Sequence, residues 1–148
     1  MNIEFLASPV CARLWLVFLA TLVAGTAAAS EVAEFDYAAP QVVLSGTLAK
    51  RVFAGPPNYR SIRSGDRPET YWILLLTKPI NVKASSGDPI NQTEQDVREL
   101  QLVFMEAETA RLVQRKAGKS VAVTGTLFSA QSGHHHTRVL LEVSGIKP

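Results

Sequence analysis

The chain has 148 residues, with 15 Lys and Arg against 13 Asp and Glu, so its formal net charge is +2. This balance gives no electrostatic case for nucleic-acid binding, because proteins of that class carry a marked basic excess. The single cysteine, Cys11, lies near the N-terminus, so the rest of the chain can form no intrachain disulfide, cysteine metal site or thiolate nucleophile.

The first 29 residues have the pattern of a secretory signal peptide. Arg13 supplies a positive charge, residues 14–23 form a short apolar core, and Ala27 to Ala29 are small residues of the kind that a signal peptidase requires. The core has about ten residues, whereas a spanning helix needs roughly 20. We therefore predict cleavage after Ala29, a periplasmic or secreted location, and no stable membrane anchor afterwards.

The part after the predicted signal divides into a lead-in and one domain. Residues 30–40 have no clear period and are predicted to be a flexible lead-in. Residues 41–148 contain five strand-like runs and one helix-like run, which is an ordinary content for a single domain of this length.

The first strand is predicted at residues 41–53. Its apolar residues Val42, Leu44 and Leu48 alternate with more polar ones, which is the period of a half-buried strand. Gly46 in the middle of this strand indicates a bend or a bulge.

The second strand is predicted at residues 69–82, after a long loop. Its run Tyr-Trp-Ile-Leu-Leu-Leu at 71–76 is apolar on both faces, which is typical of a central strand. Trp72 is expected to point into the core, because large aromatic side chains dominate core burial. Pro79 indicates that the far end of this strand is an edge or a break.

The second half of the domain is predicted as a strand, a helix and two further strands. The helix has acidic residues at its start and basic residues at its end, as the helix dipole favours, and Gly118 follows as a C-terminal stop. The predicted ranges are 97–105 for the third strand, 106–117 for the helix, 119–130 for the fourth strand and 137–146 for the fifth.

This order of elements predicts a mainly β protein, a small five-stranded OB-like Greek-key barrel with one helix between strands three and four. It is the order of the oligonucleotide/oligosaccharide-binding fold. Gly46 would then be the bend that lets the first strand pair with both halves of the barrel. An unrelated small β-sandwich or an α+β roll is the alternative.

Two loops are the predicted recognition surface, because OB-like barrels bind ligands with the loops that join strands one to two and four to five. Residues 54–69, here called the basic loop, are stiffened by prolines and rich in arginine. An anionic ligand or an envelope protein would suit this loop. The predicted ligand-binding residues are Tyr59, Arg60, Arg63, Asp66, Glu69 and, from the second loop, His135.

A plainer interpretation of the basic loop is also open. Arg63 or Arg67 would form local ion pairs with Asp66 or Glu69, and the loop would fold back on itself. Such exposed pairs are common and contribute about 0–1 kcal/mol each.

Residues 131–137, here called the histidine loop, contain three consecutive histidines. In an extended segment His134 and His136 would share one face while His135 points away. Since imidazole is the commonest metal-binding side chain, His134 and His136 are candidate ligands for zinc or copper. Two histidines are too few for a tight site, so the alternatives are a structural role and direct ligand contact, with no cofactor at all.

No catalytic residue is assigned, because the chain contains no G-x-S-x-G, P-loop or G-x-G-x-x-G motif. We therefore rank three hypotheses. The first is a monomeric exported binding module with an unidentified ligand or protein partner and no nucleic acid. The second is a metal-binding protein, and the third is a hydrolase-type enzyme.

The sequence also resembles an uncharacterised bacterial family, the domain of unknown function 4431. The resemblance is carried by residues 118–128 and 132–141, with support from Gly-Pro-Pro-Asn-Tyr at 55–59 and Gln-Leu-Val at 101–103. Arg138 stands where the family pattern leads us to expect a proline before Val139. The resemblance implies a bacterial envelope protein and brings no activity with it.

Overall fold

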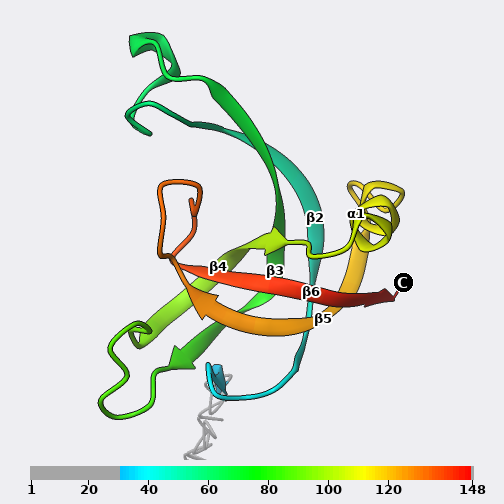
Figure 1. Cartoon of the computed structure of the whole chain (residues 1–148). Helices are drawn as coiled ribbons and strands as arrows, with labels where there is room; N and C mark the ends of the chain where they lie inside the picture. The colour runs from blue at the N-terminus through cyan, green and yellow to red at the C-terminus, as the bar shows by residue number, and fades with distance from the viewer. Residues whose placement is uncertain (1–30, 148) are drawn as a thin grey trace, which may run out of the picture. The chain divides into compact units, whose positions relative to one another are not determined.

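The computed structural model describes residues 31–147, and this range forms one compact unit. The predicted signal peptide lies outside the described residues. Residues 31–147 form strands β1 to β6, the α-helix α1 and a short 3₁₀ turn η1, and Figure 1 labels β2 to β6 and α1. Their bounds are β1 Ala33–Asp36, β2 Val42–Ala54, η1 Ile62–Ser64, β3 Pro68–Lys83, β4 Glu94–Val103, α1 Ala107–Gln114, β5 Ser120–Ser129 and β6 Val139–Lys147.

Five of these strands close into a barrel. Each strand pairs with the next in the order β2, β3, β4, β6, β5, and β5 pairs back to β2. The β4–β6 pair is parallel, and the other four pairs are antiparallel. Helix α1 connects β4 to β5. The predicted fold class is confirmed: the protein is mainly β, with a closed five-stranded barrel and one helix between the third and fourth barrel strands.

Glycines let the barrel strands bend and approach one another. Gly46 pairs with Leu76 on β3 and with Val121 on β5, so β2 belongs to both halves of the barrel, as the sequence predicted. A Cβ at Gly46 would lie 2.3 Å from the carbonyl oxygen of Leu75, and one at Gly125 would lie 2.1 Å from that of Glu142. Only glycine fits this close to a neighbouring backbone.

The core fills the barrel and reaches the helix. The alternation that predicted the strands places apolar side chains inside, and α1 adds Val113, which is fully buried. Trp72 packs against this core and remains partly exposed. The other core residues below 2% exposure include Leu48, Leu74, Val82, Leu100, Val123, Val139 and Leu141.

Two features outside the barrel's centre bear on the sequence predictions, one as a correction and one as a confirmation. Residues 33–36 were expected to lack regular structure, but they form β1, which pairs in parallel with Ile80–Lys83 of β3. The break predicted at Pro79 is present, because the pairing of β3 with β4 shifts register between Leu75 and Ile80, and β3 continues to Lys83. The pairing of β3 with β2 stops at Leu76, and β1 pairs with β3 beyond that point.

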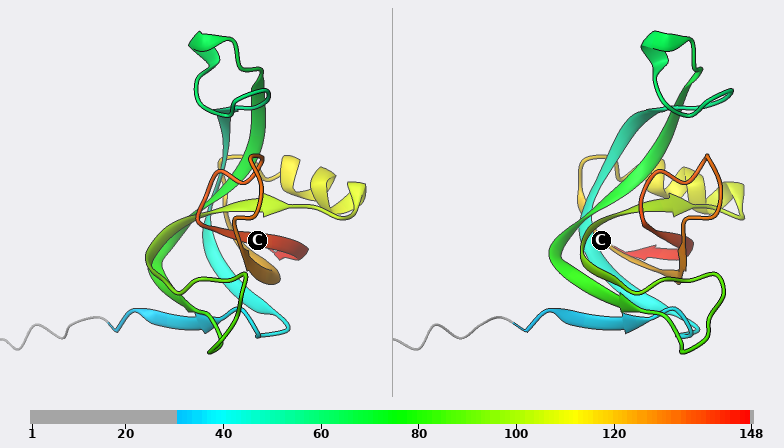
Figure 2. Two further views of the ribbon diagram at one scale, coloured as in Figure 1. Left: turned by 60° about the vertical axis from the view of Figure 1, so that its left-hand side comes forward. Right: turned by 90° about the vertical axis from the view of Figure 1, so that its left-hand side faces the viewer.

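One hairpin extends beyond the barrel and positions the basic loop. The β2–β3 ladder continues from Gly46↔Leu76 to Ala54↔Pro68, and Figure 2 shows this ribbon rising above the other strands with the loop at its tip. The histidine loop joins β5 to β6 and lies on the same side of the molecule as that ribbon. Within residues 31–147, no helix is long and apolar enough to cross a membrane.

Candidate functional site

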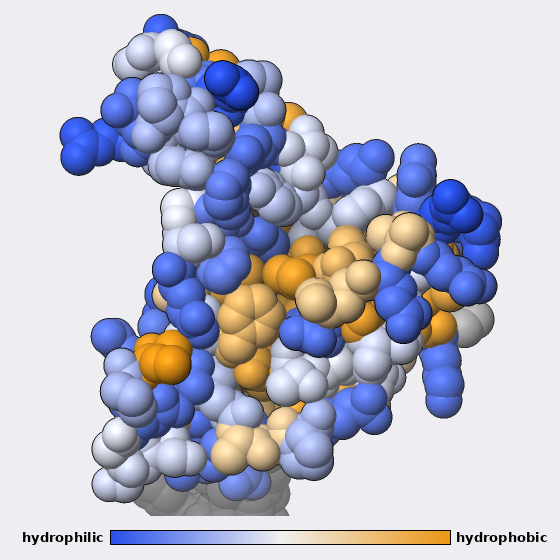
Figure 3. Space-filling view, viewed as in Figure 1, coloured by the Kyte–Doolittle hydropathy of each residue, from blue (hydrophilic) through white to orange (hydrophobic). Residues whose placement is uncertain are grey.

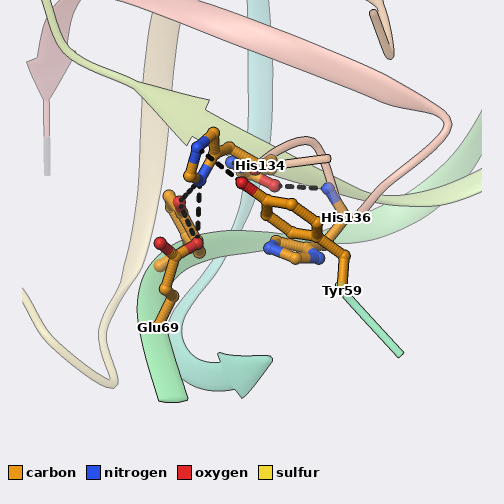
Figure 4. Close-up of polar contacts among 6 residues, drawn as sticks. Tyr59, Glu69, His134 and His136 are labelled. Carbon is orange, nitrogen blue, oxygen red and sulfur yellow. Dashed lines mark hydrogen bonds and ion pairs between the residues drawn. The ribbon is translucent and has the colours of Figure 1, made fainter. Parts of the chain in front are cut away.

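The basic loop and the histidine loop are joined at His134. The Tyr59 hydroxyl lies 3.1 Å from His134 Nε2, and Glu69 Oε2 lies 2.9 Å from His134 Nδ1. The Tyr71 hydroxyl donates to the same Glu69 oxygen at 2.9 Å. Figure 4 shows His134 between Tyr59 and Glu69. We call these four residues the loop interlock.

The proton positions in the interlock follow from which groups can only accept. A carboxylate has no proton to give, so in neutral His134 the Nδ1–H donates to Glu69 and Nε2 accepts from the Tyr59 hydroxyl. The hydrogen bonds from His134 and Tyr71 hold the pKa of Glu69 below its usual range. Burial, together with the Glu69 carboxylate, raises the pKa of Tyr71 to about 12. In the folded protein these hydrogen bonds tie the two loops together.

Tyr59 is held in an uncommon backbone conformation. Its φ is 57°, in the left-handed region that bulky residues rarely adopt. A Cβ on Gly133 would lie 2.8 Å from the Tyr59 ring, so this glycine gives the ring room to pack. The ring edge also meets His134, with 5.1 Å between centroids. Strained residues persist only where surrounding contacts fix them, and here the contacts come from the other loop.

Asp66 organises the basic loop from the inside. It is only 3% exposed, and its carboxylate accepts the backbone N–H groups of Asn58, Arg60 and Ser61 at 2.7–2.9 Å. The side-chain amide of Asn58 donates as well. These hydrogen bonds lower the pKa of Asp66 to about 2. The structure therefore uses this predicted ligand-binding residue to fold the loop, with its oxygens turned inward.

The arginines of the basic loop point outward. Arg60, Arg63 and Arg67 are exposed, and none of them takes part in the five ion pairs found within residues 31–147. The alternative of local pairing with Asp66 or Glu69 is wrong for this structure, because Asp66 bonds to backbone groups and Glu69 pairs with His134. The loop therefore presents uncompensated positive charge on a fixed backbone.

The other two histidines are held by packing. The His136 ring stacks on Phe53 at 4.3 Å with an interplanar angle of 4°, and it also meets Tyr71. His135 turns away, accepts the Gln131 N–H at its Nδ1 and packs its ring against Phe128. Burial lowers the pKa of both rings. The alternation predicted for the histidines is thus present, with 134 and 136 on the β3 side.

The geometry around the predicted metal ligands is that of a hydrogen-bonded cluster. Both ring nitrogens of His134 are engaged, and the ring of His136 stacks on Phe53 with Tyr71 tilted against it. Within residues 31–147 no group of three or more His, Cys, Asp or Glu side chains is placed to hold a metal ion. No third ligand therefore joins the two histidines there.

Gln101 on β4 fixes the histidine loop, and the sequence analysis missed it. It is 2% exposed; its Nε2 donates to the His134 carbonyl and its Oε1 accepts from the His136 N–H, both at 2.8 Å. Its own N–H donates to Thr137 Oγ1 at 2.9 Å. Glutamine on the outward face of a strand is normally solvated, so its residue type gave no signal.

Comparison with known proteins identifies a family for the second half of the domain. The family model described as domain of unknown function (DUF4431) matches residues 99–147. This confirms the resemblance over a range that includes α1, β5, the histidine loop and β6. The basic loop lies outside the matched range. A comparison with curated proteins found no match.

Proposed function

We propose that this chain is an exported binding module that recognises an anionic ligand or partner with the basic loop and the histidine loop. The observation that carries the proposal is the loop interlock, which joins the two loops into one surface through His134. The predicted contacts Tyr59, Arg60 and Arg63 all belong to this surface.

A fixed surface lowers the entropy that binding must overcome. Ordering a mobile loop costs free energy on association, so a loop that is already ordered binds more tightly with the same contacts. Asp66 and His134 supply that order here, because each is bonded to several groups of the loops. The unpaired arginines can then meet an anion without first releasing an internal partner.

The setting of this module is inferred from the sequence and from the barrel. The signal-like N-terminal segment favours a periplasmic or secreted protein, and the family resemblance favours a bacterial envelope. The strand order β2-β3-β4-β6-β5, with the helix after β4, supports an OB-like barrel. A near-neutral charge disfavours nucleic acid as the ligand, and we expect a monomer.

The experiment removes charge from the basic loop and measures binding to a polyanion. We expect Arg60→Ala/Arg63→Ala in the full chain to bind immobilised heparin at least about tenfold more weakly, because each cation near an anionic surface contributes roughly 1 kcal/mol. The matched control is Arg111→Ala/Arg115→Ala, which removes two exposed arginines around α1. Its affinity should equal that of the wild type.

A second arm distinguishes the source of the anion. Vesicles of phosphatidylcholine with phosphatidylglycerol offer the same charge on a lipid headgroup, and heparin offers it on a polysaccharide. Binding to only one of the two identifies the class. Equal losses in the loop variant and the helix control, or no binding to either probe, would refute the proposed function.

A further inference from the structure

A polar pocket lies at the seam between β4 and the segment that leads into β6. Its volume is about 360 Å³, within the roughly 300–1,000 Å³ of small-molecule sites. The seam opens there because the parallel β4–β6 ladder starts only at Gln101↔Leu140. At that point the Gln101 N–H donates to the side-chain oxygen Oγ1 of Thr137 and not to a backbone carbonyl of β6. Just before Val139 the chain therefore contacts β4 through the side chains of Thr137 and Arg138 and not through a backbone ladder.

The pocket carries balanced charge. Its lining includes two arginines and two carboxylates, Arg98 and Arg138 with Asp96 and Glu99. A lone anion would meet the carboxylates, and a lone cation would meet the arginines. A small ligand with both charges can place each one against its opposite, which is the arrangement that electrostatic complementarity favours.

Arg98 has room for a carboxylate beside its existing partner. Its Nε and Nη2 each lie 3.0 Å from an oxygen of Asp96, which uses one edge of the guanidinium. The other three of its five N–H donors make no hydrogen bond within residues 31–147. Since the side chains of this pair are 70% and 61% exposed, the pair itself contributes little and can adjust at small cost.

Acceptors for an ammonium group lie on the same strand. Glu99 Oε2 forms an ion pair with Arg51 at 2.6 Å. Its other oxygen, Oε1, accepts no hydrogen bond in the described part of the chain. His136 also lines the pocket, and its Nε2 is buried without a hydrogen-bond partner there. Because burial lowers the pKa of this ring, it is neutral at pH 7, and Nε2 donates or accepts according to its tautomer.

We propose that this pocket binds a free α-amino acid as a zwitterion, with its carboxylate on Arg98 and its ammonium group on Glu99 and Asp96. The adjacent opposite charges of an amino acid match the adjacent Arg98 and Asp96. The inference goes beyond the proposed function, because the site uses none of the arginines of the basic loop.

The test is a titration of the full chain, ¹⁵N-labelled, with L-alanine, L-glutamine and L-phenylalanine, which sample three side-chain sizes. We expect at least one of them to give saturable amide shifts confined to residues 96–99 and 136–138. N-acetylated and amidated forms of that amino acid each lack one charge. Both should bind at least about tenfold more weakly if both charges are recognised.

Two variants separate this site from the basic loop. Arg98→Ala should weaken amino-acid binding at least about tenfold and leave heparin binding unchanged. Because the Arg98 side chain is exposed, its removal should leave the fold intact, and circular dichroism verifies this. Arg60→Ala/Arg63→Ala should retain the amino-acid affinity. The inference is overturned if none of the three amino acids gives saturable shifts, if the shifts map elsewhere, or if the singly charged analogues bind equally well.

Discussion

Asp66 holds the backbone of the basic loop in place, although its neighbours in the sequence suggest a different role for it. Arginines stand on both sides of it in the sequence, at 63 and 67, so ion pairing or ligand contact was the natural prediction. In the structure its donors are backbone N–H groups of residues 58, 60 and 61. No residue type reports such bonds, because every residue except proline carries the same N–H group. The role of Asp66 could therefore not be predicted from the sequence.

The same carboxylate should make stability depend on pH. The N–H groups of Ser61, Arg60 and Asn58 lower the pKa of Asp66 to about 2, from an ordinary value of 3.8. A group with a lowered folded-state pKa stabilises the fold above its unfolded-state pKa, and this contribution is lost as the pH falls through the folded-state value. We expect Asp66→Asn to lower the melting temperature at pH 7, by an amount that shrinks between about pH 4 and about pH 2.

Thermal unfolding of both proteins across this pH range measures the effect. Glu142→Gln is the control, since Glu142 is exposed on β6 and takes part in none of the ion pairs of residues 31–147. Its melting curve should follow the wild type at every pH. A difference for Asp66→Asn that stays constant down to pH 2 would show that the carboxylate charge is not what holds the loop.

At the scale of elements, the sequence predicted where the two loops lie but did not predict the contacts that fix the histidine loop. The barrel order placed the basic and histidine loops on one side, and the period of an extended chain put His134 and His136 on one face. Both follow from regular geometry. The partner of the histidine loop did not, because Gln101 stands between Leu100 and Leu102 and its outward side is covered only after the loop folds over β4. Contacts between distant elements leave no local pattern.

Replacing Gln101 should release the histidine loop. Gln101→Leu keeps a side chain of similar size and removes the two bonds to the His134 carbonyl and the His136 N–H. Losing these two partly buried hydrogen bonds should lower the free energy of unfolding by about 1–3 kcal/mol. We expect faster amide hydrogen exchange at His136, because its N–H loses its acceptor.

Chemical denaturation and hydrogen exchange measure the two effects separately. Gln114→Leu, at an exposed position at the end of α1, is the matched control and should change neither. Gln101→Leu with unchanged exchange at His136 would mean that packing of its ring on Phe53 is sufficient to hold the loop.

At the scale of the whole molecule, closure of the barrel depends on two glycines, Gly46 and Gly125, that lie close to a neighbouring backbone. Both stand in a Ser/Thr-Gly-Thr-Leu run, at 45–48 and at 124–127. The sequence predicted a bend at Gly46 from the glycine alone. It could not predict how near the neighbouring strand would come, because that distance depends on the pairing of β2 with β3 and of β5 with β6. By contrast β1, whose four residues show no alternation in burial, lies outside the closed ring and left no periodic signal.

Alanine at either glycine should destabilise the barrel as a whole. The new Cβ would lie 2.3 Å from the Leu75 oxygen at position 46, or 2.1 Å from the Glu142 oxygen at position 125. Backbone atoms cannot move aside as a side chain can, so we expect the free energy of unfolding to fall by an amount at or above the upper end of the roughly 1–3 kcal/mol typical of overpacking.

Gly145→Ala is the control, because its Cβ would meet only Thr124 Cβ, at 3.9 Å. Urea denaturation monitored by tryptophan fluorescence measures all three variants. If Gly46→Ala and Gly125→Ala were as stable as Gly145→Ala, the strands would have to be able to separate at these points, and barrel closure would not depend on the glycines.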